Sequence, residues 1–146
     1  MGAPTKRNKP DPDLGMLGQR LLFAVQRELF ARIAERGFDD IHPRHGAVLA
    51  YLQPGGSRAT DLSQLSGQHK QVVGTMIDEL ERLGYVERQP DPEDRRAKLV
   101  CPTERGLRQM AAADEIIRSI EERHARRLGA ENYVRFKSAL IDVAEH

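Results

Sequence analysis

The chain has 146 residues, which is enough for one domain and too few for two of ordinary size. With 39% hydrophobic and 31% charged residues, the composition predicts a soluble globular protein, and a net charge of +1 excludes a coat protein that binds nucleic acid through overall basicity. A single cysteine, Cys101, excludes an internal disulfide and fits the cytoplasm, and no apolar run is long enough for a membrane span.

The N-terminal part of the chain divides into an arm and a long helix. Residues 1–13 contain three prolines and mixed charges, which predict a flexible arm. Apolar residues then recur every three or four positions over residues 14–37, which predicts an amphipathic helix that Gly37 ends. Leu22 and Phe23 widen its apolar face, so we expect one side to pack on the core and the other on a partner.

The middle of the chain predicts short helices. We expect them over residues 47–52, 59–65 and 69–83, from the spacing of their apolar residues. Turn sequences separate them, namely Pro54-Gly55-Gly56 and Ser66-Gly67.

A hairpin and further helices complete the pattern. Residues 85–89 and 98–101 are rich in valine, leucine and tyrosine and flank the proline-punctuated stretch 90–96, which predicts two paired strands. Thr103 is a good N-cap for a helix that ends at Gly129, and a last helix follows it.

The order of these elements predicts a mainly α-helical fold with a small β-hairpin (α+β), in a single domain over residues 1–146. A helix, a tight turn, a helix and a hairpin make up a winged helix-turn-helix, which we expect over residues 43–102. Residues 14–37 and 103–146 are expected to be dimerisation helices, because they carry more apolar surface than so short a chain can cover alone.

The start of the predicted helix at residues 69–83 carries side chains suited to DNA. They are amide, imidazole, ammonium and hydroxyl groups, which are the donors and acceptors that base edges require. The second half, residues 78–82, is acidic, so we expect only the N-terminal half to touch DNA. The candidate DNA contacts, including the hairpin's basic residues, are Arg58, Gln68, His69, Lys70, Gln71, Val72, Thr75, Arg95, Arg96 and Lys98.

Simpler explanations exist for both sets of residues. Residues 68–75 have the alternative of an ordinary solvated helix face, and the hairpin downstream favours DNA contact. Arg95 and Arg96 have the alternative of surface ion pairs with the acids of residues 91–94. We expect those pairs too, in particular Arg95 with Asp94, as interactions that orient the arginines and are exchanged for DNA.

One long stretch of sequence resembles a known family. The residues from Val72 to Gly106 read VVGTMIDELERLGYVERQPDPEDRRAKLVCPTERG, and the run resembles the signature of the MarR (multiple antibiotic resistance regulator) family. The similarity is strong over residues 58–106, and the flanking helices match only in length and order. One departure is His69, which stands where the family usually has a capping serine or threonine.

This resemblance implies a homodimer that places two recognition helices on a pseudo-palindromic DNA site. It also implies repression that is relieved by a small, often phenolic, ligand or by oxidation. Arg20, Phe23 and His45 are candidates for a ligand pocket between the dimerisation helices and the winged helix, and core or interface packing is the alternative for all of them.

Other chemistry is not expected. His42 and His45 lack a third metal ligand nearby, so helix-start and surface roles are expected in place of a metal site. Cys101 lies on a strand predicted to face the core, which favours an inert packed thiol over a redox sensor. No catalytic set, cofactor motif or phosphate-binding loop is present, so an enzyme is not predicted.

A ligand-responsive repressor is therefore the leading hypothesis for the function. The alternative is a DNA-binding module without a small-molecule signal, which is regulated by its abundance or by a protein partner. The two differ in whether a ligand pocket exists and is occupied.

Overall fold

The computed structural model describes residue 2 and residues 11–146. Most of the flexible arm expected over residues 1–13 lies outside these described residues. The helices are α1 (Leu14–Glu35), the short 3-10 helix η1 (Pro43–His45), α2 (Gly46–Leu49), α3 (Ala59–Ser66), α4 (Lys70–Arg82), α5 (Glu104–Leu128) and α6 (Ala130–Glu145). The strands are β1 (Val86–Pro90) and β2 (Lys98–Pro102), which form an antiparallel hairpin. This architecture confirms the predicted fold class.

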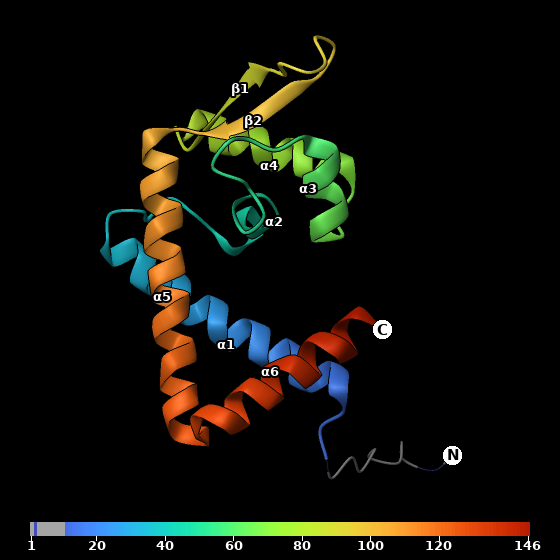
Figure 1. Ribbon diagram of the computed structural model, residues 1–146, viewed down its shortest axis with the longest axis vertical. Coiled ribbons are helices and arrows are strands. Elements are labelled where there is room, and N and C mark those ends of the chain that lie inside the picture. Colours follow the sequence, from blue (N-terminus) through green and yellow to red (C-terminus); the bar gives the residue numbers. More distant parts are fainter. Residues whose placement is uncertain (1, 3–10) are drawn as a thin grey trace.

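The elements divide between two ends of the molecule. The segment from η1 to β2, here called the winged lobe (residues 43–102), lies at one end, where the hairpin borders α4 (Figure 1). Helix α5 leads away from it, and α6 turns back from the far end of α5 (Figure 1). Helix α1 packs against α5. Within the described residues, no helix combines the length and the apolar character needed to cross a membrane.

Local capping explains where several helices begin and end. The Asp13 carboxylate accepts a hydrogen bond from the Met16 backbone N–H at 2.8 Å, which begins α1. The Thr103 hydroxyl accepts one from the Gly106 N–H at 3.1 Å, which confirms the predicted N-cap of α5. Gly37 has a φ of 97° after the end of α1, a conformation that glycine adopts without strain.

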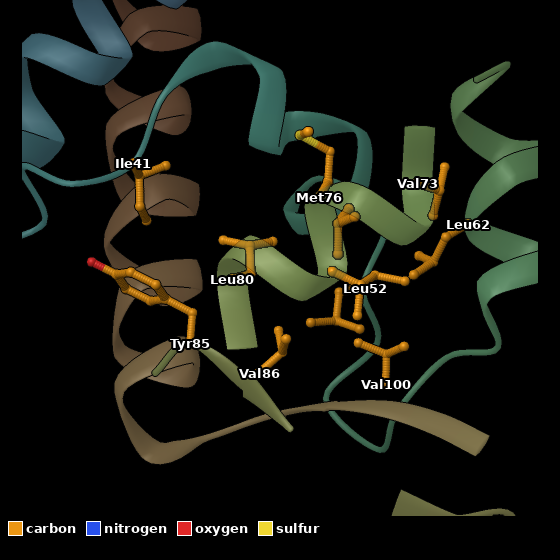
Figure 2. Packing of buried hydrophobic residues seen from close by; sticks show 11 residues of the cluster. Ile41, Leu52, Leu62, Val73, Met76, Leu80, Tyr85, Val86 and Val100 are labelled. Atoms are coloured by element: carbon orange, nitrogen blue, oxygen red, sulfur yellow. The ribbon is translucent and has the colours of Figure 1, made fainter. Parts of the chain in front are cut away.

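A hydrophobic core fills the winged lobe and includes Ile41 from the segment just before it. Side chains from its helices and its hairpin meet there, and Figure 2 shows those of α4 among the others. Removing such side chains from water is the main stabilising term of the lobe. The core residues are Ile41, Val48, Leu52, Leu62, Val73, Met76, Ile77, Leu80, Tyr85, Val86 and Val100.

A smaller cluster joins α1 to α5, and many apolar side chains of α1 and α6 stay exposed. Ile33 is the one buried residue of α1, and α6 has none among its residues. The cluster consists of Ile33, Ala112, Ile116 and Ile120. The large apolar side chains left exposed on α1 and α6 are Leu14, Met16, Leu17, Leu21, Leu22, Phe23, Val134, Phe136, Ile141 and Val143.

A polar joint connects the winged lobe to α5. The Tyr85 ring is fully buried, its hydroxyl donates to Asp40 at 2.5 Å, and the Arg105 guanidinium lies 4.2 Å above the ring centre. Burial and the Asp40 carboxylate raise the pKa of Tyr85, so the phenol stays protonated. Gly106 completes the joint, because a Cβ there would lie 2.0 Å from the Tyr85 carbonyl oxygen.

Cys101 does not face the core as predicted. On β2 the alternation places Val100 in the core, so the neighbouring Cys101 points to the opposite side and is half-buried. Its sulfur packs over the turn at Gly56, where an added Cβ would lie 2.8 Å from Sγ. Burial, and to a smaller extent Glu87, raises the pKa of the thiol, which disfavours the reactive thiolate.

Candidate nucleic-acid interface

The first half of α4 presents polar side chains to solvent. One face of the helix is buried through Val73, Met76, Ile77 and Leu80. The opposite side leaves Lys70, Gln71, Val72 and Thr75 exposed. Gln71 and Thr75 are about one turn apart, so they lie on the same side of the helix. The first half of α4 thus exposes an ammonium, an amide, a hydroxyl and the methyl groups of Val72 to solvent.

Thr75 has part of its hydrogen-bonding capacity already occupied. Its hydroxyl donates to the Gln71 backbone carbonyl at 3.0 Å. With the proton so used, the oxygen is left to accept, and the methyl group remains exposed. Toward a major groove, this side chain would suit the amino group of adenine or cytosine, or a thymine methyl group.

The turn before α4 is fixed by serines rather than by His69. The Ser63 hydroxyl donates to the Gln68 carbonyl at 2.6 Å, and the Gln68 N–H donates to the Ser66 hydroxyl at 3.2 Å. His69 occupies the N-cap position without a side-chain capping bond, as its poor capping ability predicts. The side chains of Gln68 and His69 are therefore exposed beside the start of α4.

The acidic second half of α4 is neutralised by partners. Arg88 on β1 donates to Asp78 at 2.6 Å and to Glu81 at 2.8 Å. The next acid along the helix, Glu79, contacts Arg44 at 3.1 Å. These carboxylates are thus paired with arginines, which reduces their repulsion of a nearby phosphate backbone. Sequence reasoning missed Arg88, because it read β1 only for its apolar content.

His45 is buried against Glu79. Its Nδ1 accepts from the His42 N–H at 3.0 Å, so Nε2 carries the ring proton and donates to Glu79 at 2.8 Å. The hydrogen bond from His45, and then that from Arg44, lowers the pKa of Glu79. The expected helix-start role fits both histidines, but the expected surface position is wrong for His45. Among the described residues, no group of three potential ligands forms a metal site.

The structure does not bring the three candidate ligand-pocket residues together. Arg20 and Phe23 are exposed on the first half of α1. His45 is buried in the winged lobe, next to α2, which lies apart from that half of α1 in Figure 1. Among the described residues, neither the hollow between α3 and the wing nor the one on α6 is lined by any of the three.

The loop of the wing is held by its own backbone and by aspartates. The Asp91 N–H donates to the Ala97 carbonyl at 3.1 Å, which closes the loop beyond the paired strands. The Asp94 carboxylate accepts from the Arg96 N–H at 3.0 Å. The side chains of Arg95 and Arg96 are exposed on this loop.

The expected ion pairs of the wing arginines are wrong. Asp94 uses its carboxylate on the Arg96 backbone, and Asp91 uses its carboxylate on Arg58. In the part of the chain that the structure describes, Arg95 and Arg96 form no ion pair, so neither has one to exchange for DNA. Lys98, at the start of β2, is exposed as well.

Arg58 fastens the wing to α3. It stands just before α3, and two of its nitrogens lie 2.7 and 2.6 Å from the same Asp91 oxygen. Asp91 is 5% exposed, and its other oxygen accepts from the Glu93 N–H. That backbone bond, followed by the Arg58 guanidinium, lowers the pKa of Asp91. Sequence reasoning took Asp91 for a surface acid. An aspartate in a turn often accepts a hydrogen bond from the backbone N–H two residues further on, as Asp91 does from Glu93.

The arrangement is that of a winged helix-turn-helix: a helix with an exposed polar half, a short helix that braces it, and a wing with exposed arginines beside it. It defines the chain as a DNA-binding transcriptional regulator. Residues 39–97 match the MarR family. The match covers most of the winged lobe, so this part of the chain is similar to the MarR family of transcription regulators, which are not enzymes, as the resemblance in the sequence predicted.

Solved structures agree with the assignment. The transcriptional repressor CouR bound to a 23-mer DNA duplex is 26% identical, with a TM-score of 0.73 over 90% of this chain and 92% of that one. CouR from Rhodococcus jostii RHA1 bound to p-coumaroyl-CoA is 25% identical, with the same TM-score and coverage. A complex of S. aureus MepR with DNA is 20% identical, has a TM-score of 0.76 over 92% and 98% of the two chains, and supports the fold alone. No curated protein matches the chain.

Proposed function

We propose that this protein is a repressor that binds a pseudo-palindromic operator as a homodimer and is released by a small aromatic ligand. The observation that carries the proposal is the division of charge around α4. The acids of its second half are paired within the protein, whereas Lys70, Arg95 and Arg96 are exposed without ion-pair partners among the described residues. Free cations beside an exposed polar helix suit phosphate and base contacts.

The proposed roles differ between the candidate contacts. Gln71 and Thr75 would read base edges, since they share the exposed side of α4. Arg95 and Arg96 would reach the adjacent minor groove or its phosphates. For Arg58 we propose a positioning role, because Asp91 occupies its guanidinium. The remaining proposed contacts flank these residues and are Gln68, His69, Lys70, Val72 and Lys98.

A second copy of the chain is the proposed cover for α1 and α6. Leu14 is 65% exposed and Val134 67% exposed, and both belong to long runs of apolar side chains on these helices. Exposed apolar surface of this extent marks an interaction site. A twofold dimer would also place two α4 helices on successive major grooves, roughly 34–36 Å apart.

The proposed ligand is an aromatic acid or its thioester. It rests on the likeness to CouR, whose structure contains p-coumaroyl-CoA. A ligand that binds the dimer with α4 helices at the wrong separation would weaken DNA binding, with a coupling of about 1–3 kcal/mol. Arg20 and Phe23 remain candidates, since a partner copy would be needed to complete a pocket around them.

A second candidate function is a DNA-binding module without a ligand. The burial of His45 favours it, because one of the proposed pocket residues is already occupied by Glu79 and the His42 backbone. In this case cellular abundance or a protein partner would set the occupancy of the operator.

The test is selection of bound duplexes from a random DNA pool, followed by titration of the selected duplex. Enrichment of an inverted repeat would support the homodimer on a pseudo-palindrome, and no enrichment would contradict it. Titration with p-coumaroyl-CoA and a panel of phenolic acids then separates the two candidates. Loss of operator affinity supports the ligand-responsive repressor, and unchanged affinity across the panel supports the module.

A further inference from the structure

Gly74 lies within α4, where the protein itself gives no reason for a glycine. In the interior of a helix glycine is less favourable than alanine, because its backbone loses more conformational freedom. Two ordinary reasons for keeping it are a positive φ and a neighbour that leaves no room for a Cβ. Gly74 is not among the glycines with positive φ, and a Cβ built on it would meet no atom within 4 Å.

At two other glycines of the chain, neighbouring atoms of the protein leave no room for a side chain. A Cβ on Gly106 would lie 2.0 Å from the Tyr85 carbonyl oxygen, and one on Gly56 would lie 2.8 Å from the Cys101 sulfur. Both positions are closed by the protein's own atoms. The space next to Gly74 is open, as it is next to Gly18 and Gly46, so no atom of this copy of the chain excludes a side chain there. Gly74 differs from those two in lying on the helix that we propose enters DNA.

The position of Gly74 indicates what that is. It is half-buried in the first half of α4, one turn after Lys70 and directly before Thr75, beside the exposed residues Gln71 and Thr75. A helix with its side chains is about 10–12 Å wide and the major groove about 12 Å, so one methyl group on the flank of the helix changes how deeply it fits.

We propose that Gly74 is the residue at which the sugar–phosphate wall of the major groove contacts the backbone of α4. The missing side chain lets the helix sit deep enough for Gln71 and Thr75 to reach base edges. Gly74 thus acts as a positioning residue for sequence reading. This inference rests on the proposed function, because it assumes that α4 enters the groove.

The test compares Gly74→Ala with wild type for stability and for binding to two duplexes, one selected from a random pool and one unrelated. We expect Tm to rise by about 2–4 °C, because alanine favours the helix and meets no clash. We expect affinity for the selected duplex to fall at least about tenfold and affinity for the unrelated duplex to change less than about twofold, because non-specific binding depends on phosphate charge.

Gly46→Ala is the matched control. Gly46 begins α2, has a φ of −61° and also has no atom within 4 Å of an added Cβ. It should leave affinity for both duplexes unchanged. A Gly74→Ala protein with unchanged operator affinity, with equal losses on both duplexes, or with a lowered Tm would overturn the inference.

Gln71→Ala, measured in parallel, separates this inference from the proposed function. If Gln71→Ala weakens binding to the selected duplex and Gly74→Ala does not, the inference about Gly74 alone is wrong. If neither variant changes that affinity, α4 does not read bases and the proposed function fails with it. Losses in both variants, confined to the selected duplex, support both.

Discussion

The winged lobe and the two helices α1 and α6 differ in how completely one copy of the chain buries their apolar side chains. In the lobe, Leu62, Val73 and Leu80 are 0% exposed. On α1 and α6, Leu14 and Val134 are about two-thirds exposed. The lobe therefore buries its apolar core within one copy of the chain, whereas much of the apolar surface of α1 and α6 stays exposed in one copy.

The largest effect on stability is expected where the winged lobe meets α5. Gly106→Ala would place a Cβ 2.0 Å from the Tyr85 carbonyl oxygen, which is backbone and has little freedom to move. We expect a loss of about 3 kcal/mol or more in the free energy of unfolding, as for severe overpacking. Denaturant unfolding measures it. Gly46→Ala is the control, and equal stability of the two variants would show that the joint is loose.

The next largest effect is expected on dimerisation, through the exposed apolar faces of α1 and α6. Phe136 is exposed on α6, within the face that we assign to a second copy. Phe136→Asp should raise the dissociation constant of the dimer at least about a hundredfold, because a charge would be buried in an apolar interface. Sedimentation measures the change.

Leu65→Asp is the matched control for that experiment. Leu65 is also a large exposed apolar residue, but it lies on α3 in the winged lobe. It should leave the dimer intact. A wild-type chain that remains a folded monomer at micromolar concentration would contradict the assignment of α1 and α6.

A smaller effect on stability is expected at the ion pair between Arg58 and Asp91, which holds the wing to α3. The pKa of Asp91 is lowered, so its bonds stabilise the fold above the ordinary carboxyl pKa and are lost as pH falls through the lowered value. Asp91→Asn should therefore be less stable than wild type at pH 7, and the difference should shrink in acid. Denaturant unfolding at both pH values checks this. A difference that is the same at neutral and acid pH would mean that the charge of Asp91 has no part in it.

Sequence reasoning succeeded where local physics decides the structure. The apolar spacing over residues 59–65 and 69–83 predicted α3 and α4 to within a residue at either end. Gly67 ends α3 as expected, and Gly84 follows the end of α4; both have a positive φ. Thr103 caps α5 because a hydroxyl before a helix satisfies its free N–H groups wherever the helix lies.

The rest depended on contacts between distant parts of the chain. Arg58 and Asp91 are far apart in sequence, and only the packing of the wing on α3 makes them partners. The same holds for His45 and Glu79. Each arginine of the wing had several acids nearby in sequence, so proximity along the chain favoured pairs that the folded backbone does not make.

The wing also has a paired part and an unpaired part, and a substitution of Arg95 tests the role of the unpaired part. Its base is closed by Arg58 and Asp91, whereas the Arg95 guanidinium has no ion-pair partner among the described residues. A guanidinium free of such a pair gives up no internal bond when it enters a narrow minor groove of negative potential. Arg95→Ala should therefore leave the fold and the dimer intact. It should weaken binding to many sequences several-fold and lower the slope of log affinity against log salt by about 0.9, the value for one phosphate.

Arg95→Lys should recover only part of the affinity, because an ammonium is more strongly hydrated than a guanidinium and is harder to strip of water in the groove. The preference for A·T pairs beside the half-sites should also decrease in Arg95→Ala, since narrow minor grooves occur in A-tracts. The measurement is operator affinity of wild type and both variants at several salt concentrations. Arg95→Ala with the affinity and salt slope of wild type would mean that the open end of the wing does not touch DNA, and that its free charge serves another purpose.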